Sequence, residues 1–123
     1  MAVTAFETPS GNIQCSVEGE GDEQLLDCVI ATADFPLPTP TEPCDVDWAA
    51  NEVTLAPPDG PTMGACRGDP PPAVLHPERS TLEYDTVSVV GDFRCLSRRT
   101  GLTCWNVRSG HGFELAREAY RPF

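Results

Sequence analysis

Two segments of the chain repeat one short pattern, and each copy places a cysteine on both arms of an expected β-hairpin. The copies span residues 11–28 and 91–104, with cysteines at Cys15, Cys28, Cys95 and Cys104. Side chains alternate between the two faces of a strand. Cysteines can therefore bond across a hairpin only when they lie opposite each other on one face. Both copies satisfy this condition, so the repeat predicts two hairpins that are each closed by their own disulfide.

The second copy also predicts a strand register. If Cys95 lies opposite Cys104, the two strands leave a four-residue loop, Arg98-Arg99-Thr100-Gly101. Glycine suits the last position of such a loop, because that position is often left-handed. The cross-strand pairs that follow are Leu96 with Thr103 and Ser97 with Leu102.

The chain has six cysteines, and two of them remain once the hairpins are closed. These are Cys44 and Cys66, which we predict to bond to each other. No C-x-x-C spacing occurs, and His76 and His111 stand apart from the cysteines, so no metal site is expected. Stable disulfides need an oxidising compartment. The expected location is therefore extracellular or at the cell surface, with a virion as the alternative.

Charge is distributed unevenly along the chain. All eight basic residues are arginine, the first of them is Arg67, and twelve acidic residues precede it; the net charge is −11. A nucleic-acid-binding surface needs a basic footprint, so nucleic acid is not an expected partner. No phosphate-cradling glycine loop occurs, and no cofactor is expected.

The N-terminal residues Met1-Ala2-Val3-Thr4 lack the basic and apolar regions of a signal peptide, so no leader is expected in the sequence as it stands. Apolar runs are only a few residues long, so no membrane span is expected either. At 123 residues the chain is expected to form one disulfide-stapled domain over residues 1–123.

Short β-branched and aromatic runs separated by turn residues predict an all-β protein, a small antiparallel sandwich or barrel. Two other segments differ: Leu115–Tyr120 has helix-like spacing, and the proline-rich residues 35–43 are expected to be extended outside the sheets. The expected strands are Val3–Phe6, Asn12–Val17, Leu25–Ala31, Glu52–Leu55, Thr62–Arg67, Thr86–Val90, Phe93–Ser97, Leu102–Val107 and Phe113–Leu115. The residues expected to be buried are Ile13, Val29, Phe93, Leu102, Trp105 and Phe113.

Several short motifs resemble a family of small disulfide-rich extracytoplasmic actinobacterial domains of unknown function. In that family the pattern is roughly S-P-S-G-N-I-x-C near the start and G-H-G-F-x-x-S-R-x-x-Y near the end. The matching segments here are residues 8–15, Cys66-x-Gly68-Asp69, residues 100–106, and residues 110–113 with Arg117 and Tyr120. Thr8, Asp85 and Ala116 depart from the family pattern, but no cysteine is lost. The resemblance implies a fold and a compartment and brings no activity with it.

The site-like segment is Gly110-His111-Gly112-Phe113, because flanking glycines allow a close approach to a ligand and histidine titrates near neutrality. The alternative is that these glycines form a hairpin turn while Phe113 enters the core. No nucleophile elbow and no H-E-x-x-H motif occurs, so no catalytic residue is expected. Glu18, Glu20, Asp22 and Glu23 lack EF-hand spacing, and Arg67-Gly68-Asp69 is better explained as turn chemistry than as a recognition tripeptide.

The expected function is a non-enzymatic extracellular binding module of an actinobacterial envelope or secreted protein, with a protein or a glycan as its partner. The expected binding surface combines His111 with Arg98, Arg99 and Arg108, and Trp48 or Trp105 would add an anchor if exposed. The alternative is a structural component of an actinophage particle, such as a capsid-decoration or tail protein. A hydrolase, or a hydrolase inhibitor, that uses His111 is a third hypothesis.

Overall fold

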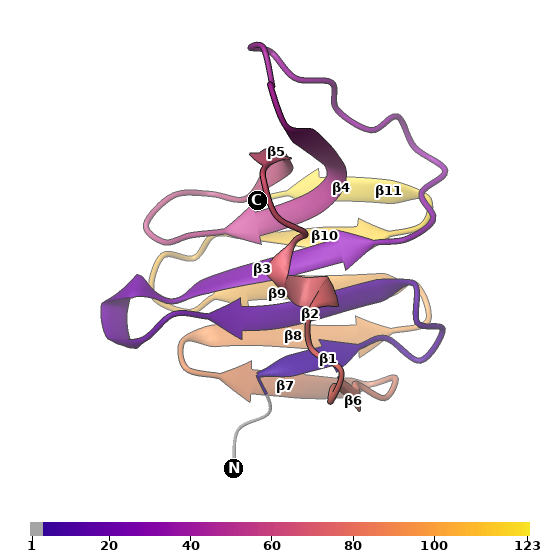
Figure 1. Ribbon diagram of the computed structural model, residues 1–123. Helices are drawn as coiled ribbons and strands as arrows, with labels where there is room; N and C mark the ends of the chain where they lie inside the picture. The colour runs from indigo at the N-terminus through magenta and orange to yellow at the C-terminus, as the bar shows by residue number, and fades with distance from the viewer. Residues whose placement is uncertain (1–3) are drawn as a thin grey trace.

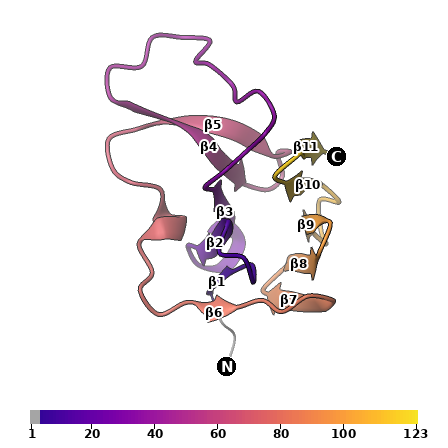
Figure 2. The ribbon, with the colours of Figure 1, turned by 90° about the vertical axis from the view of Figure 1, so that its right-hand side faces the viewer.

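The structure is a computed structural model that describes residues 4–123, and it consists of two β-sheets packed face to face (Figure 1). The first sheet has the order β5-β4-β3-β2-β1-β6 and the second β11-β10-β9-β8-β7. Figure 2 shows the two layers from the side. The strands of the first sheet are β1 (Ala5–Glu7), β2 (Ile13–Glu18), β3 (Leu25–Ile30), β4 (Asp47–Leu55), β5 (Thr62–Arg67) and β6 (Ser80–Thr81). Those of the second are β7 (Thr86–Val90), β8 (Phe93–Arg98), β9 (Gly101–Asn106), β10 (Gly112–Ala116) and β11 (Ala119–Pro122).

The all-β sandwich that the sequence predicts is confirmed. Neighbouring strands pair antiparallel except β1 and β6, which pair in parallel. Two 3₁₀ turns, η1 (Gly21–Glu23) and η2 (Pro72–Val74), are the helical elements in the described part of the chain. None of the helices among residues 4–123 has the length and apolar character needed to cross a membrane.

The three predicted disulfides are present, and two of them lie in the centre of the sandwich. Cys15 faces Cys28 across β2 and β3, and Cys95 faces Cys104 across β8 and β9, with a Cα–Cα distance of 4.1 Å in both pairs. This distance is typical of a directly opposed antiparallel pair without hydrogen bonds. All four sulfur-bearing side chains are buried, so each sheet contributes one staple to the shared core.

Alternation around these cysteines decides which apolar residues are buried. Of the predicted core residues, Ile13, Phe93, Leu102 and Phe113 are buried. The prediction was wrong for Val29 and Trp105, which are only partly buried. Each follows an inward-facing cysteine, Cys28 or Cys104, so its side chain points to the outer face of its sheet. The inner faces are completed by Phe6, Val17, Leu26, Ile30, Val53, Leu55, Leu82, Val90 and Leu115.

Most expected strands are confirmed to within about one residue at either end, and β5 and β7 have the expected bounds. β4 is longer than expected, because it begins at Asp47 and not at Glu52. The short strand β6 was not expected. Val3, where the first strand was expected to begin, lies outside the described residues, as does Met1. The helix-like spacing of residues 115–120 was misleading, because Ala116 pairs with Ala119 in a hairpin between β10 and β11. A helix there would leave the edge of β10 unpaired, whereas the hairpin adds a strand to the sheet.

The register of the second cysteine hairpin is confirmed, including Leu96 opposite Thr103 and Ser97 opposite Leu102. Its turn is tighter than expected, because Arg98 pairs with Gly101 and only two residues remain between them. Gly101 has a φ of +144°, and a Cβ there would lie 2.9 Å from the Cβ of Ala116. This glycine therefore lets the β8–β9 turn approach the β10–β11 turn closely.

The proline-rich residues 35–43 project beyond the sheets as an extended loop, as expected (Figure 1). Cys44 and Cys66, 5.8 Å apart at their Cα atoms, attach the end of this loop to β5. The Trp48 indole donates a hydrogen bond of 2.8 Å to the carbonyl of Pro38. Trp48 is thus partly buried beneath the loop, where its role is structural.

Candidate functional site

The residues predicted to form one binding surface lie at opposite ends of the second sheet. Arg98 ends β8 and Arg99 lies in the turn that follows, whereas Arg108 and His111 belong to the loop after β9. Successive turns of an antiparallel meander alternate between the two ends of a sheet, so a six-residue strand separates these pairs. The expectation that the two loops would present the four side chains together is therefore corrected.

Arg108 and His111 have local partners. Arg108 lies 3.5 Å from a carboxylate oxygen of Asp22 and 3.4 Å from one of Asp92. His111 Nδ1 lies 3.4 Å from the carbonyl oxygen of Phe123. These contacts hold the β9–β10 loop against its neighbours.

The glycines beside His111 serve the hairpin. Gly110 has a φ of +77°, and a Cβ on Gly112 would overlap the backbone carbonyl of Cys104 and lie 2.7 Å from the ring of Phe123. Phe113 is fully buried in the core. This segment therefore forms a hairpin turn, and Phe113 packs in the core. Of the two interpretations of the sequence, the turn is the one that fits the structure.

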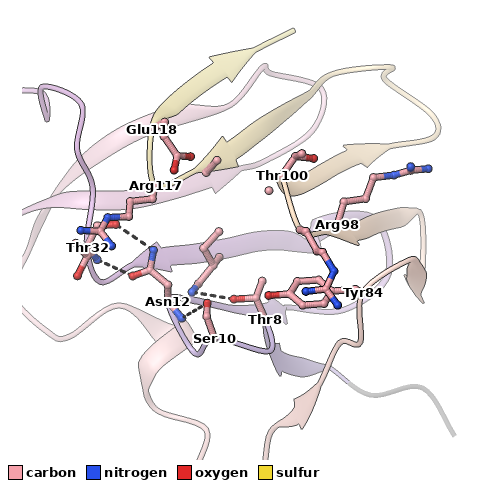
Figure 3. Close-up of a pocket in the computed structure, with 13 residues that line it drawn as sticks. Thr8, Ser10, Asn12, Thr32, Tyr84, Arg98, Thr100, Arg117 and Glu118 are labelled. Carbon is pink, nitrogen blue, oxygen red and sulfur yellow. Dashed lines mark hydrogen bonds between the residues drawn. The ribbon is translucent and has the colours of Figure 1, made fainter.

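The opposite end of the sandwich carries a cavity of about 370 Å³ (Figure 3). Four separate loops surround it: the β1–β2 loop, the residues after β3, the β8–β9 turn and the β10–β11 turn. Tyr84, which precedes β7, closes one side. The lining consists of Thr8, Ser10, Asn12, Ile13, Thr32, Tyr84, Arg98, Arg99, Thr100, Gly101, Ala116, Arg117 and Glu118.

The floor of this end cavity is set by the β1–β2 loop. The Asn12 amide accepts a hydrogen bond from the Thr32 backbone N–H (2.8 Å) and donates one to the Thr32 carbonyl (3.0 Å). The Thr8 hydroxyl accepts from the Ile13 N–H at 3.3 Å, and the Ser10 hydroxyl accepts from the Asn12 N–H at 3.2 Å. These bonds fix the loop and leave hydroxyl groups along the cavity.

The two sides of the end cavity each carry a guanidinium group. On one side Arg117 donates through Nε to a carboxylate oxygen of Asp34 at 2.8 Å, and its carbonyl accepts the Asp34 N–H. On the other side the Arg99 guanidinium lies 4.8 Å from the centre of the Tyr84 ring. In Figure 3, Arg117 and Tyr84 lie on opposite sides of Asn12 and Thr8, and the Arg98 side chain points away along the rim.

Positive charge is concentrated here relative to the rest of an acidic protein. Three of the eight arginines, Arg98, Arg99 and Arg117, line this one cavity. Others are engaged elsewhere: Arg67 with Glu52, Arg108 with Asp22 and Asp92, and Arg121 with Glu114. Arg98 lies at the rim, and Arg99 and Arg117 stand at the two sides; counted against Glu118 in the lining and Asp34, which is paired to Arg117, these three arginines leave about one net positive charge at the cavity and its rim.

The cavity also brings together segments that stood apart as sequence motifs. The motif of residues 8–15 supplies Thr8, Ser10 and Asn12, the motif of residues 100–106 supplies Thr100 and Gly101, and the last motif supplies Arg117. These segments are recognisable as separate motifs in the sequence, but their pattern alone does not group them as one site. A signal for two of them is that residues 8–12 and residues 100–101 both lie shortly before a cysteine of their hairpin, Cys15 or Cys104. The segment with Arg117 has no cysteine and gives no such signal.

A second polar cluster lies on the outer face of the first sheet; its two carboxyl side chains, Asp27 and Glu52, are buried, and Arg67 is partly exposed. Arg67 donates to both carboxylate oxygens of Glu52, at 2.6 and 2.5 Å, and lies 3.7 Å from Asp27. The segment containing η2 covers Asp27, and the Ala73 N–H donates to its carboxylate at 3.0 Å. Arg67, the first residue of the Arg-Gly-Asp tripeptide, is therefore committed to an internal ion pair.

The pKa values of Asp27 and Glu52 are shifted in opposite directions. Burial, together with the hydrogen bond to Glu52, raises the pKa of Asp27 from 3.8 to about 8. Burial opposes ionisation of Glu52 too, but the hydrogen bonds from Arg67 and Asp27 hold its pKa below the ordinary value. Asp27 is therefore protonated at neutral pH and donates to the Glu52 carboxylate. Neither acid lines the end cavity, which makes this cluster a structural one.

The other sequence candidates have ordinary surroundings. Glu18, the first acid of the β2–β3 loop, contacts His76 at 2.9 Å. Over residues 4–123 no group of three or more histidine, cysteine or acidic residues is placed to hold a metal ion. All six cysteines are disulfide-bonded.

Comparison with known proteins gives one result. The chain matches a family described as a family of unknown function, DUF6636, over residues 2–123. No curated protein and no solved structure matches it. The family match includes both sheets and every residue of the end cavity.

Proposed function

The chain belongs to the DUF6636 family, and we propose that it is a non-enzymatic extracellular binding module that engages a protein or glycan through the end cavity. The observation that supports this proposal is the convergence of four loops on one cavity lined by hydroxyl groups and three arginines. Binding residues are commonly presented by loops on a rigid scaffold. Here the scaffold is the disulfide-stapled sandwich.

The proposed setting is the cell envelope or a secreted protein of an actinobacterium. Three disulfides in a domain of 123 residues are consistent with an oxidising compartment. The motif resemblance supports the actinobacterial source.

The composition of the cavity supports binding in preference to catalysis. A hydrolytic site needs a nucleophile within hydrogen-bond reach of a base. The cavity lining contains hydroxyl groups and guanidinium groups, and its one carboxylate is Glu118. His111 lies at the other end of the sheet, so it is not the base for any hydroxyl in this cavity.

A pull-down from actinobacterial envelope extracts tests the proposal. The test variant replaces Arg98, Arg99 and Arg117 with alanine, and the matched control replaces Arg108 and Arg121, which are arginines outside the cavity. We expect the control to recover the same partner as the unmodified protein and the test variant to lose it, with thermal melts checking that both are folded. Equal recovery by all three proteins would discard this surface.

A second arm addresses catalysis. We expect no turnover of generic esterase or glycosidase substrates by the unmodified protein. Turnover that disappears in His111→Ala would replace the binding proposal with the hydrolase hypothesis.

One feature favours the particle-component alternative. On the outer face of the second sheet, the edge strand β7 exposes Val87 (48%) and Val89 (54%). A subunit of a particle would bury such side chains against its neighbours. Sedimentation at increasing protein concentration distinguishes the two proposals: ordered assembly would favour the particle component, and a monomer at all concentrations favours the binding module.

A further inference from the structure

Within the proposed binding function, we propose that the ligand of the end cavity is an acidic saccharide, that is, a sugar ring that bears a carboxylate. The juxtaposition that carries this inference is a guanidinium group on either side of a floor of hydroxyl groups. Arg117 stands on one side and Tyr84 on the other, with Thr8 and Ser10 between them (Figure 3). The Arg99 guanidinium lies over the Tyr84 ring, so it stands on the side opposite Arg117.

The arginines are prepared to receive a carboxylate. Arg117 uses its Nε for Asp34, and guanidinium has five N–H donors in a planar fork that matches carboxylate geometry. Arg99 is held over Tyr84, at 4.8 Å from the ring centre, so part of its conformational freedom is already lost before a ligand arrives. Both groups can therefore form charge-assisted hydrogen bonds at small additional entropic cost.

The hydroxyl-rich floor fits the remainder of a sugar. Serine and threonine hydroxyls both donate and accept hydrogen bonds, as sugar hydroxyls do. Thr8, Ser10 and Thr100 lie in the lining and are carried by backbone that is held by hydrogen bonds or by a tight turn. The volume of about 370 Å³ is near the lower end of ligand cavities and suits one sugar ring with its bound water.

Charge balance favours a carboxylate over a phosphate. Arg99 and Arg117 at the sides and Arg98 at the rim, counted against Glu118 and Asp34, leave about one net positive charge at the cavity and its rim. A carboxylate brings one negative charge, whereas a phosphate monoester brings up to two near neutral pH. The net charge of −11 on the whole chain also repels polyanions. A singly charged sugar satisfies the site without an excess of negative charge.

The test is a titration followed by two-dimensional ¹⁵N NMR on the complete chain, with D-glucuronate, D-glucose, acetate and inorganic phosphate as separate probes. We expect D-glucuronate to shift the side-chain amide of Asn12 and the backbone amides of Thr100 and Gly101. Glucose and acetate should each bind at least about tenfold more weakly, because each supplies only one half of the recognition.

Variants locate the effect. Arg117→Gln and Arg99→Gln should each weaken D-glucuronate binding by about tenfold or more, while Arg121→Gln, an arginine on the outer face of the second sheet, should leave it unchanged. Phosphate or acetate binding as tightly as glucuronate would overturn the saccharide assignment, as would glucose doing so or all four probes failing to bind. If the probes fail while the arginine variants still lose the pull-down partner, the binding function stands and only the ligand class is overturned.

Discussion

Stability of this protein is expected to fall as the pH rises through the neutral range, because one buried acid is neutral in the folded state. Asp27 is fully buried, and its pKa is raised from 3.8 to about 8. Between these values the folded protein holds a proton that the unfolded chain has released. The stabilisation from the shared proton is therefore complete at low pH and is lost as the pH approaches 8.

The magnitude follows from the width of that window. Each pH unit in which the two states differ by one proton changes the free energy of unfolding by about 1.4 kcal/mol. From pH 5 to pH 8, three units, the loss is about 4 kcal/mol. Glu52 contributes stability in the opposite pH direction, because its pKa is lowered in the folded state. Its contribution is lost only as the pH falls below the ordinary glutamate range.

Asp27→Asn isolates this effect. Asparagine keeps the shape, its oxygen can accept from the Ala73 N–H, and its amide can donate to Glu52 without titrating. The free energy of unfolding of the variant should therefore not decline between pH 5 and pH 8. Relative to its own value at pH 5, the variant should be more stable at pH 8 than the wild type is. Asp45→Asn, at an exposed aspartate, serves as the matched control and should follow the wild type.

Urea unfolding at pH 5, 6, 7 and 8 without reductant measures the difference, and no free thiol is present to exchange with the disulfides. Contributions that the three proteins share cancel when wild type and variant are compared. If the free energy of unfolding of wild type and of Asp27→Asn changed between pH 5 and pH 8 by the same amount, to within about 1 kcal/mol, that result would refute a proton shared between Asp27 and Glu52.

Two further predictions concern packing. Replacing Cys95 and Cys104 together by alanine should lower the free energy of unfolding by about 3 kcal/mol in urea titrations, because the unfolded chain is no longer constrained by this loop. An unchanged unfolding midpoint would contradict this. Gly64→Ala should destabilise by about 1–3 kcal/mol and alter tryptophan fluorescence, because φ is +92° and a Cβ would lie 2.5 Å from the Trp48 ring. Gly68→Ala, where nothing lies within 4 Å, is the control and should remain within about 0.5 kcal/mol of wild type.

The local pattern of residues was enough to predict the hairpins, and with them the disulfides and much of the core. Once Cys28 and Cys104 face inward, strict alternation fixes the side of every residue in their strands. The same rule, applied one residue further, would have placed Val29 and Trp105 on the outer faces. Those two errors came from ranking residues by hydrophobicity without following the alternation that the cysteines impose.

The second misjudged segment needed information from another strand. Residues 115–120 have apolar spacing that suits a short helix, but the unpaired edge of β10 is satisfied when the chain turns at Ala116 and returns as β11. Hydrogen bonding to a neighbouring strand is a tertiary effect, and it outweighs the weak preference of so short a segment.

The alternation, the turns and the staples depend on residues close to one another along the chain, so the local pattern of residues was enough to predict them. Which turns share an end of the sandwich depends on how the two sheets pack, and this is evident only in the fold. The fold places Arg108 and Arg98 at opposite ends of the second sheet. It brings Arg117 near Asn12, because Asn12 is hydrogen-bonded to Thr32 and Arg117 is hydrogen-bonded to Asp34. It also placed Asp27 beneath the η2 segment, 46 residues away. These pairings depend on how two sheets stack to bury a common core, which no local pattern specifies.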